Sequence, residues 1–133
     1  MIKLKDLLKE IESNTRKVYD GPDISSKDTS INGEVVEEIN LLYDSGKLHG
    51  NIIDYGAGQY SRNANFLRAN GLKVYTYDLY WGTAADGYTE ISNILPSETF
   101  DVGFTSYVLN VVKVSTEKSI LSWMNSHCKK QYH

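Results

Sequence analysis

The sequence predicts an α/β fold: a doubly wound, mainly parallel sheet, truncated after about four strands and preceded by N-terminal helices. Helical and strand-like patterns alternate along the chain, and strands separated by helices form parallel sheets. The stretch 51–80, NIIDYGAGQYSRNANFLRANGLKVYTYDLY, reads as strand, glycine turn, helix and strand, with an aspartate near the end of each strand. A chain of 133 residues holds one core and is too short for two ordinary domains.

Residues 1–46 are expected to form an N-terminal helical segment with a covering loop. Apolar residues at helical spacing predict an amphipathic helix over 2–17. Gly, Pro, Asp and Ser then indicate a loop over 19–33. A second helix is predicted from about Gly33 to Ser45, with Ser30 or Asn32 as its cap. Its buried stripe would be Val35, Val36, Ile39, Leu41 and Leu42.

Residues 47–133 are expected to form the core of the same compact domain. The run FDVGFTS, residues 100–106, is almost continuously apolar, as in a parallel strand buried on both faces. Residues 87–92 indicate a short strand, and 115–130 a final helix. The other predicted elements are strands over 51–56 and 72–80 and a helix over about 61–70.

Composition restricts the classes of function. The net charge of −3 and the pI near 5.6 give no general attraction to nucleic acid, although a local basic patch is not excluded. Cys128 is the only cysteine, so no internal disulfide forms. The N-terminus lacks the apolar run of a signal peptide or membrane span. We therefore expect a cytoplasmic protein without a membrane partner.

The glycine turn and a distal acid predict a nucleotide site. Gly56 and Gly58 follow the first strand, and Asp78 lies twenty residues past Gly58, at the end of the next strand. A carboxylate there can accept hydrogen bonds from both hydroxyls of a ribose. The alternative is that the glycines form a structural turn and that Asp78 is a strand-end turn residue.

Asp54 distinguishes between two ligand classes. A dinucleotide site requires a third glycine where this chain has Ser61, and a charged Asp54 would repel a pyrophosphate. S-adenosylmethionine has no phosphate and carries an ammonium and a sulfonium group. An acid before the turn therefore favours S-adenosylmethionine. The alternative for Asp54 is an ordinary capping acid of the following helix.

Three motifs carry a resemblance to a known family: two lie in the first stretch quoted below, and the third, a fourth-strand motif, is the second stretch. The stretches DYGAGQYSRNANFLRANGLKVYTYD and FDVGFTSYVLNVV resemble those of Rossmann-like (class I) S-adenosylmethionine-dependent methyltransferases, in the small form found in bacteria and their phages. The resemblance covers residues 51–112. It implies a methyltransferase that uses S-adenosyl-L-methionine and transfers its methyl group to an acceptor that the sequence does not identify.

The resemblance also implies roles for residues at the strand ends. Asp54, Gly56 and Gly58 would line the methionine part of the cofactor, and Asp78 would hold the ribose. The remaining assignments are Ser92 or Asn93 against the adenine, Ser106 and Tyr107 facing the methyl group and substrate, and Tyr107 and Asn110 as candidate catalytic residues.

The chain departs from the family in several places. Tyr60 replaces the usual third glycine, and no Asn-Pro-Pro-Tyr motif follows residues 100–106, which argues against that subclass of DNA amino-methylating enzymes. The family sheet has seven strands, whereas here one helix is expected after 100–106. That strand would have an exposed apolar edge. We expect a homodimer or a partner to cover it; coverage by the chain's own helices, or a longer parent protein, are the other solutions.

Two other functions remain open. The chain can be a non-catalytic module that binds or sequesters S-adenosylmethionine, since half of the family's sheet is missing, or an interaction domain that binds nothing. No metal site is predicted, because His49, His127 and His133 show no ligand spacing with Cys128.

Overall fold

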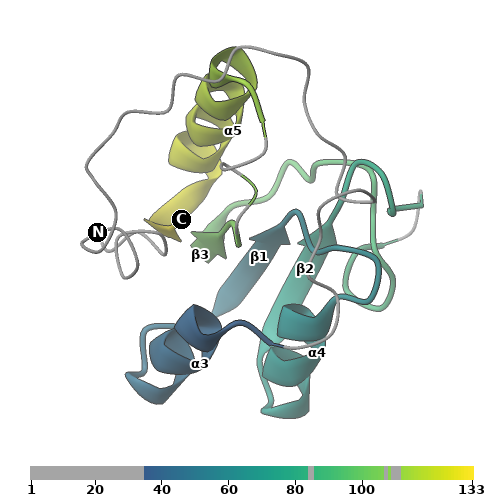
Figure 1. Cartoon of the computed structure of the whole chain (residues 1–133). Coiled ribbons are helices and arrows are strands. Elements are labelled where there is room, and N and C mark those ends of the chain that lie inside the picture. The colour runs from purple at the N-terminus through teal and green to yellow at the C-terminus, as the bar shows by residue number, and fades with distance from the viewer. Residues whose placement is uncertain (1–34, 84–85, 107, 109–111) are drawn as a thin grey trace.

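The structure is a computed structural model that describes residues 35–83, 86–106, 108 and 112–133. Over these residues the chain is an α/β fold with a four-stranded, all-parallel sheet in the order β2-β1-β3-β4. Figure 1 shows α3 and α4 on one face of this sheet and α5 on the other. The elements are α3 (Glu37–Asp44), β1 (Asn51–Tyr55), α4 (Arg62–Ala69), β2 (Lys73–Tyr77), β3 (Phe100–Phe104), α5 (Val114–His127) and β4 (Cys128–Tyr132).

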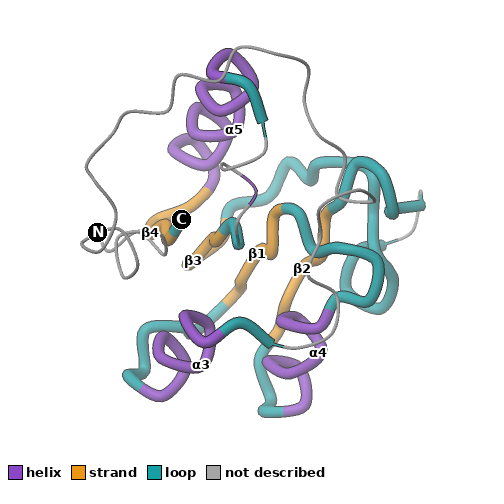
Figure 2. The backbone as a smooth tube through the Cα atoms, viewed as in Figure 1, coloured by secondary structure: helices purple, strands orange, loops and turns teal. Residues whose placement is uncertain are grey.

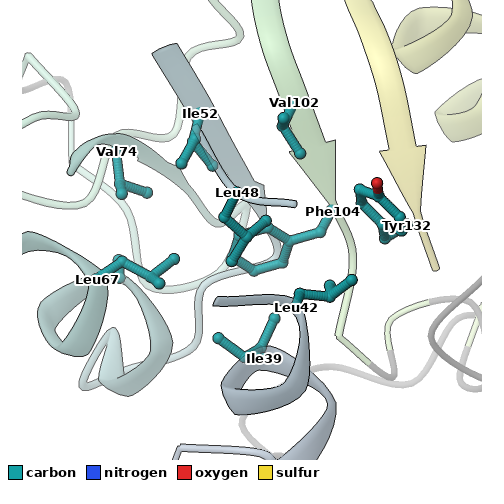
Figure 3. Packing of buried hydrophobic residues seen from close by; sticks show 10 residues of the cluster. Ile39, Leu42, Leu48, Ile52, Leu67, Val74, Val102, Phe104 and Tyr132 are labelled. Carbon is teal, nitrogen blue, oxygen red and sulfur yellow. The ribbon is translucent and has the colours of Figure 1, made fainter. Parts of the chain in front are cut away.

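The core lies on both faces of β1. Successive side chains of a strand point to opposite faces, so Ile52 and Ile53, both fully buried, enter different clusters. Figure 3 shows Ile52 and side chains from the other three strands facing those of α3 and α4. On the opposite face, Ile53 packs with the cluster that contains Met124 of α5. This double burial explains why β1 and β3 read as apolar runs.

The first described helix begins later than predicted. Val35 and Val36 are not helical; Val36 is extended and its N–H donates to Asn63 Oδ1 at 3.1 Å. β-Branched residues tolerate extended backbone well, and both valines pack against the α3/α4 cluster. Leu41, predicted to be buried, is 50% exposed. The predicted helix 2–17, the loop 19–33 and the capping residues lie outside the described residues.

The end of the chain corrects one prediction. The last helix stops at His127 instead of continuing through residue 130, and Cys128–Tyr132 forms β4. This strand pairs in parallel with β3, with Phe100 opposite Cys128 and Phe104 opposite Tyr132 (Figure 2). The prediction that the strand over residues 100–106 has an exposed edge is therefore wrong, because β4 of the same chain pairs with that edge. A homodimer or a covering partner was expected because this edge would be exposed, and pairing with β4 removes that reason.

Residues 87–92 were also predicted as a strand. Ser92 makes only isolated bridges there, to Tyr77 and Thr83. The segment still runs beside β2, since Thr76 donates to the carbonyl of Gly87 at 2.7 Å and accepts from the N–H of Ser92 at 2.9 Å. The segment thus supplies hydrogen-bond partners to the backbone of Thr76 on the outer edge of β2, without forming a regular strand.

Candidate nucleotide site at the carboxyl edge of the sheet

All four strands end at one edge of the sheet, which we call the carboxyl edge. The glycine loop, residues 56–61, connects β1 to α4 there. The N–H groups of Gly56 and Ala57 both donate to the carbonyl of Tyr77, at 2.7 and 3.0 Å, which ties the loop to the end of β2. Gly56 has a φ of +90°, and a Cβ on it would lie 2.2 Å from Val108 Cγ2. The turn therefore requires glycine at this position.

Asp78 connects the glycine loop to the turn after β2. Its Oδ2 accepts from the N–H of Gly58 at 2.9 Å. Its Oδ1 accepts from the N–H groups of Tyr80 at 2.9 Å and Trp81 at 3.1 Å. The residue is only 2% exposed. Asp78 is thus more than a strand-end turn residue, because it holds together the two loops that border the carboxyl edge. Contact of Asp78 with a ribose is a prediction that binding experiments must test.

Asp54 is the least satisfied polar group of this edge. It lies in β1 between Thr76 of β2 and Phe104 of β3, and it is completely buried. Neither carboxyl oxygen has a hydrogen-bond partner among the described residues. Burial, with a smaller contribution from the nearby charge of Asp78, raises its pKa to about 8, and Arg68 acts in the opposite direction. Asp54 is therefore mainly protonated at neutral pH.

This protonation changes one expectation. From the sequence, Asp54 is expected to carry a negative charge, whereas burial makes the neutral carboxyl the stable form without a ligand. The alternative of a helix-capping acid is also wrong, because the N-cap of α4 is Ser61, not Asp54. Asp54 is instead a strand residue, and its two carboxyl oxygens accept or donate no hydrogen bond among the described residues.

Arg68, which is not among the residues predicted from the sequence, supplies the positive charge near Asp54. Its Nη2 donates to the carbonyls of Val74 at 2.8 Å and Gly87 at 3.0 Å, and to Thr76 Oγ1 at 3.3 Å. These bonds hold α4 against β2 and the segment after residue 86. Burial lowers the pKa of Arg68, and Asp54 and Asp86 oppose that shift. The signal in the sequence was one arginine on the buried side of the predicted helix.

Of the two residues predicted to contact the adenine, Ser92 lies beside Asp78 and Asn93 bonds to Thr83. Ser92 is fully buried and its carbonyl accepts from the N–H of Asp78 at 3.0 Å. Its hydroxyl bonds locally, accepting from the N–H of Ile94 at 3.0 Å. Asn93 is exposed, and its N–H donates to the carbonyl of Thr83 at 2.8 Å. Ser92 therefore lies next to Asp78, but its hydroxyl bonds to Ile94 in its own loop.

The carboxyl ends of β3 and β4 carry a second polar group. Thr105 Oγ1 and His133 Nδ1 lie 2.8 Å apart, and His133 Nε2 lies 2.8 Å from Gln131 Oε1. The amide nitrogen of Gln131 donates in turn to Asn125 of α5. This chain of contacts, which we call the Thr105–His133 network, was missed because residues up to 130 were expected to be helical. Ser106, half-buried, follows Thr105; Tyr107 and Asn110 lie outside the described residues.

Large apolar side chains border the Asp78 loop on both sides. Tyr60 is 49% exposed, with the Arg62 guanidinium 5.1 Å from its ring centroid. Leu79 and Tyr80, directly after Asp78, are 63% and 42% exposed. Tyr60, which stands where the resembled family has a glycine, therefore leaves its ring accessible beside the glycine loop.

Within the described residues, no group of three or more His, Cys, Asp or Glu side chains could hold a metal ion. Over the same part of the chain, no helix has the length and apolar character needed to cross a bilayer. In comparisons with known proteins, no family model, no curated protein and no solved structure matches this chain. The site is therefore interpreted from its own geometry.

Proposed function

We propose that the chain binds S-adenosylmethionine at the carboxyl ends of β1 and β2 and is a methyltransferase-like protein with a Rossmann-like core. The observation that carries the proposal is Asp54, a completely buried carboxyl group whose two oxygens have no partner among the described residues. Buried polar groups are normally hydrogen-bonded, and an exception indicates a missing ligand or a functional role. An ammonium or sulfonium group would supply what Asp54 lacks.

The surrounding geometry supports an adenosine ligand. The glycine loop and Asp78 form one hydrogen-bonded unit, and ligands of parallel α/β sheets bind beyond the carboxyl ends of the strands. The exposed Tyr60, Leu79 and Tyr80 offer apolar surface for a flat base next to that unit. The strand order also agrees with the resembled family, in which the strand after β3 pairs with β3's outer edge.

Methyl transfer requires little from the protein beyond positioning. The methyl carbon of a sulfonium is already activated, and orientation and proximity contribute about 7–11 kcal/mol. Ser106 lies at the end of β3, where the resembled family places its substrate, and Tyr107 and Asn110 remain the predicted catalytic residues. The methyl acceptor is unidentified; protein, small molecule and nucleic acid all fit this proposal.

A second candidate is a module that binds S-adenosylmethionine without transferring the methyl group. The Thr105–His133 network favours it, because the polar groups at the ends of β3 and β4 bond to one another rather than facing an open site. Incubation with labelled S-adenosylmethionine and candidate acceptors distinguishes the two. Methylated product supports the enzyme, and binding without product over the acceptors supports the module.

Titration calorimetry tests the proposal directly. We expect S-adenosylmethionine and its demethylated product S-adenosylhomocysteine to bind, and NAD not to bind. Asp78→Ala should weaken binding by about 1–3 kcal/mol, because the glycine loop loses its anchor and the ribose its acceptor. Asp44→Ala, an exposed aspartate at the end of α3, should bind as the wild type does. Tight NAD binding, or no binding of either sulfur compound, would contradict the proposal.

A further inference from the structure

We propose that a cationic ligand expels a proton from Asp54 when it binds, so that the site releases a proton to solvent and its affinity for the ligand rises with pH. The inference rests on the proposed function and adds a coupling between ligand binding and protonation. It follows from the position of one carboxyl group and of the charges that face it.

The position of Asp54 favours a proton on the free protein. The residue lies in β1, which has β2 on one side and β3 on the other, and it is completely buried. A carboxylate in such a place would need several hydrogen-bond donors, and among the described residues it has none. The neutral carboxyl has the lower free energy there as long as no cation is close.

The nearby charged groups do not reverse this preference. Asp78, after β2, disfavours a second negative charge, while Arg68 on α4 favours one. Arg68 is the weaker influence, since its guanidinium already donates to the carbonyls of Val74 and Gly87. On the β3 side the neighbour of Asp54 is Phe104, which carries no charge. Burial, which is the largest influence, together with these two charges leaves the pKa of Asp54 at about 8.

A bound ammonium or sulfonium changes the balance. Opposite charge within about 4–6 Å lowers the pKa of a carboxyl group by roughly 1–3 units. The O–H bond of Asp54 then breaks, the proton passes to the buffer, and the carboxylate keeps the electron pair and faces the cation. A phosphate in the same place would instead hold the proton on Asp54. Proton release therefore reports which kind of ligand the site accepts.

Calorimetry in two buffers of different ionisation enthalpy counts the protons. At about pH 6.5 the wild type should release up to about one proton per S-adenosylhomocysteine bound, the full value being reached when the ligand lowers the pKa of Asp54 by about 3 units, because Asp54 is protonated before binding and the ligand's ammonium group keeps its own proton. Asp54→Asn should release about none, and the exposed-site control Asp44→Asn should match the wild type. 5′-Methylthioadenosine, which has the adenosine but no ammonium, should bind without release.

The outcomes separate this inference from the proposed function. Equal proton counts for wild type and Asp54→Asn, with binding intact, overturn the coupling and leave ligand binding standing. Failure of both sulfur compounds to bind overturns both. Should Asp54→Asn not fold, the contrast between S-adenosylhomocysteine and 5′-methylthioadenosine on the wild type decides. In the wild type, affinity for S-adenosylhomocysteine should rise with pH between about pH 5 and 8, by up to about tenfold per pH unit; a flat profile contradicts the coupling.

Discussion

The carboxyl ends of β1 and β2 differ sharply from those of β3 and β4. At the first pair, both oxygens of Asp54 and the hydroxyl of Ser61 are buried without a hydrogen-bond partner among the described residues, although Asp78 beside them accepts three N–H bonds. At the second pair, Thr105 and His133 bond to each other, and His133 also bonds to Gln131. Asp54, Thr105 and His133 belong to one sheet edge and are all buried, so burial alone does not explain the difference.

The contrast agrees with the proposed binding role of the first pair and with a structural role of the second. Unsatisfied buried groups cost about 1–3 kcal/mol each and persist where a ligand or function requires them. A closed network contributes to stability instead, and the Thr105–His133 network joins β4 to β3 where the ladder ends. We therefore expect mutations at the first pair to relieve instability or alter ligand binding, and mutations at the second pair to lower stability alone.

The largest expected effect is a pH-dependent loss of stability caused by Asp54. Its pKa is about 8 in the folded chain and about 4 in an unfolded one, so the folded state holds one more proton between these values. The stabilisation is complete below about pH 4 and is lost as pH rises through about 8. Urea denaturation without ligand should show the wild type losing about 3 kcal/mol relative to Asp54→Asn between about pH 5 and pH 8.

The difference between the two proteins isolates Asp54 from other titrating groups. Hydrogen bonds lower the pKa values of Asp86 and Asp101, and the stability that these two contribute is lost only as pH falls below about 4. The other titratable groups are the same in both proteins, so their effects cancel in the difference. A difference that stays constant with pH would mean that Asp54 is ionised in the free protein, and it would weaken the contrast between the two ends of the sheet.

Much of the architecture was readable from the sequence. β1, α4 and β2 lie close to their predicted bounds. The strand 51–56 is a short apolar run, the strand 72–80 is rich in β-branched and aromatic residues, and glycines separate both from the helix over 61–70. β4 was not readable. Its five residues, Cys-Lys-Lys-Gln-Tyr, place two exposed lysines in succession directly after a helix, which resembles a polar helix end. Pairing with β3, a contact between residues far apart in sequence, makes the segment a strand.

The candidate site was only half predictable. Asp54, Gly56, Gly58 and Asp78 were found because a strand, a glycine turn and a distal acid recur at fixed spacing. The protonation of Asp54 could not be read from sequence, since it depends on complete burial and on Asp78 across the strand ends. The Thr105–His133 network joins residues 28 positions apart, and no local pattern marks it.

A smaller effect is expected from Thr105→Val at the second pair. The substitution removes the hydroxyl and leaves a ring nitrogen of buried His133 without that partner, which should cost about 1–2 kcal/mol in the free energy of unfolding. Thr105→Ser keeps the hydroxyl and should lose less than Thr105→Val. Urea denaturation measures stability, and calorimetry should show unchanged affinity for S-adenosylhomocysteine. A large loss of affinity with little loss of stability would place Thr105 in the site and reverse its assignment to the structural side.

The smallest expected effect is a gain from Ser61→Gly at the first pair. Ser61 has φ +48° and ψ +43°, a left-handed conformation that disfavours side chains, and its buried hydroxyl has no partner among the described residues. Glycine removes both costs, so urea denaturation should show about 1 kcal/mol of added stability. Ser45→Gly is the matched control: Ser45 has a φ of −85°, its hydroxyl donates to the carbonyl of Leu42, and its loss should destabilise.

Ser61→Gly also restores the third glycine of the dinucleotide pattern, in register with Gly56 and Gly58. If the missing glycine were what excludes NAD, this variant should gain affinity for NAD. If the buried Asp54 determines the ligand, the variant should be more stable but should still prefer S-adenosylhomocysteine to NAD. We expect the second result, because the substitution leaves the carboxyl group, its burial and the need for a cation unchanged. Tight NAD binding by Ser61→Gly would show instead that loop shape selects the ligand.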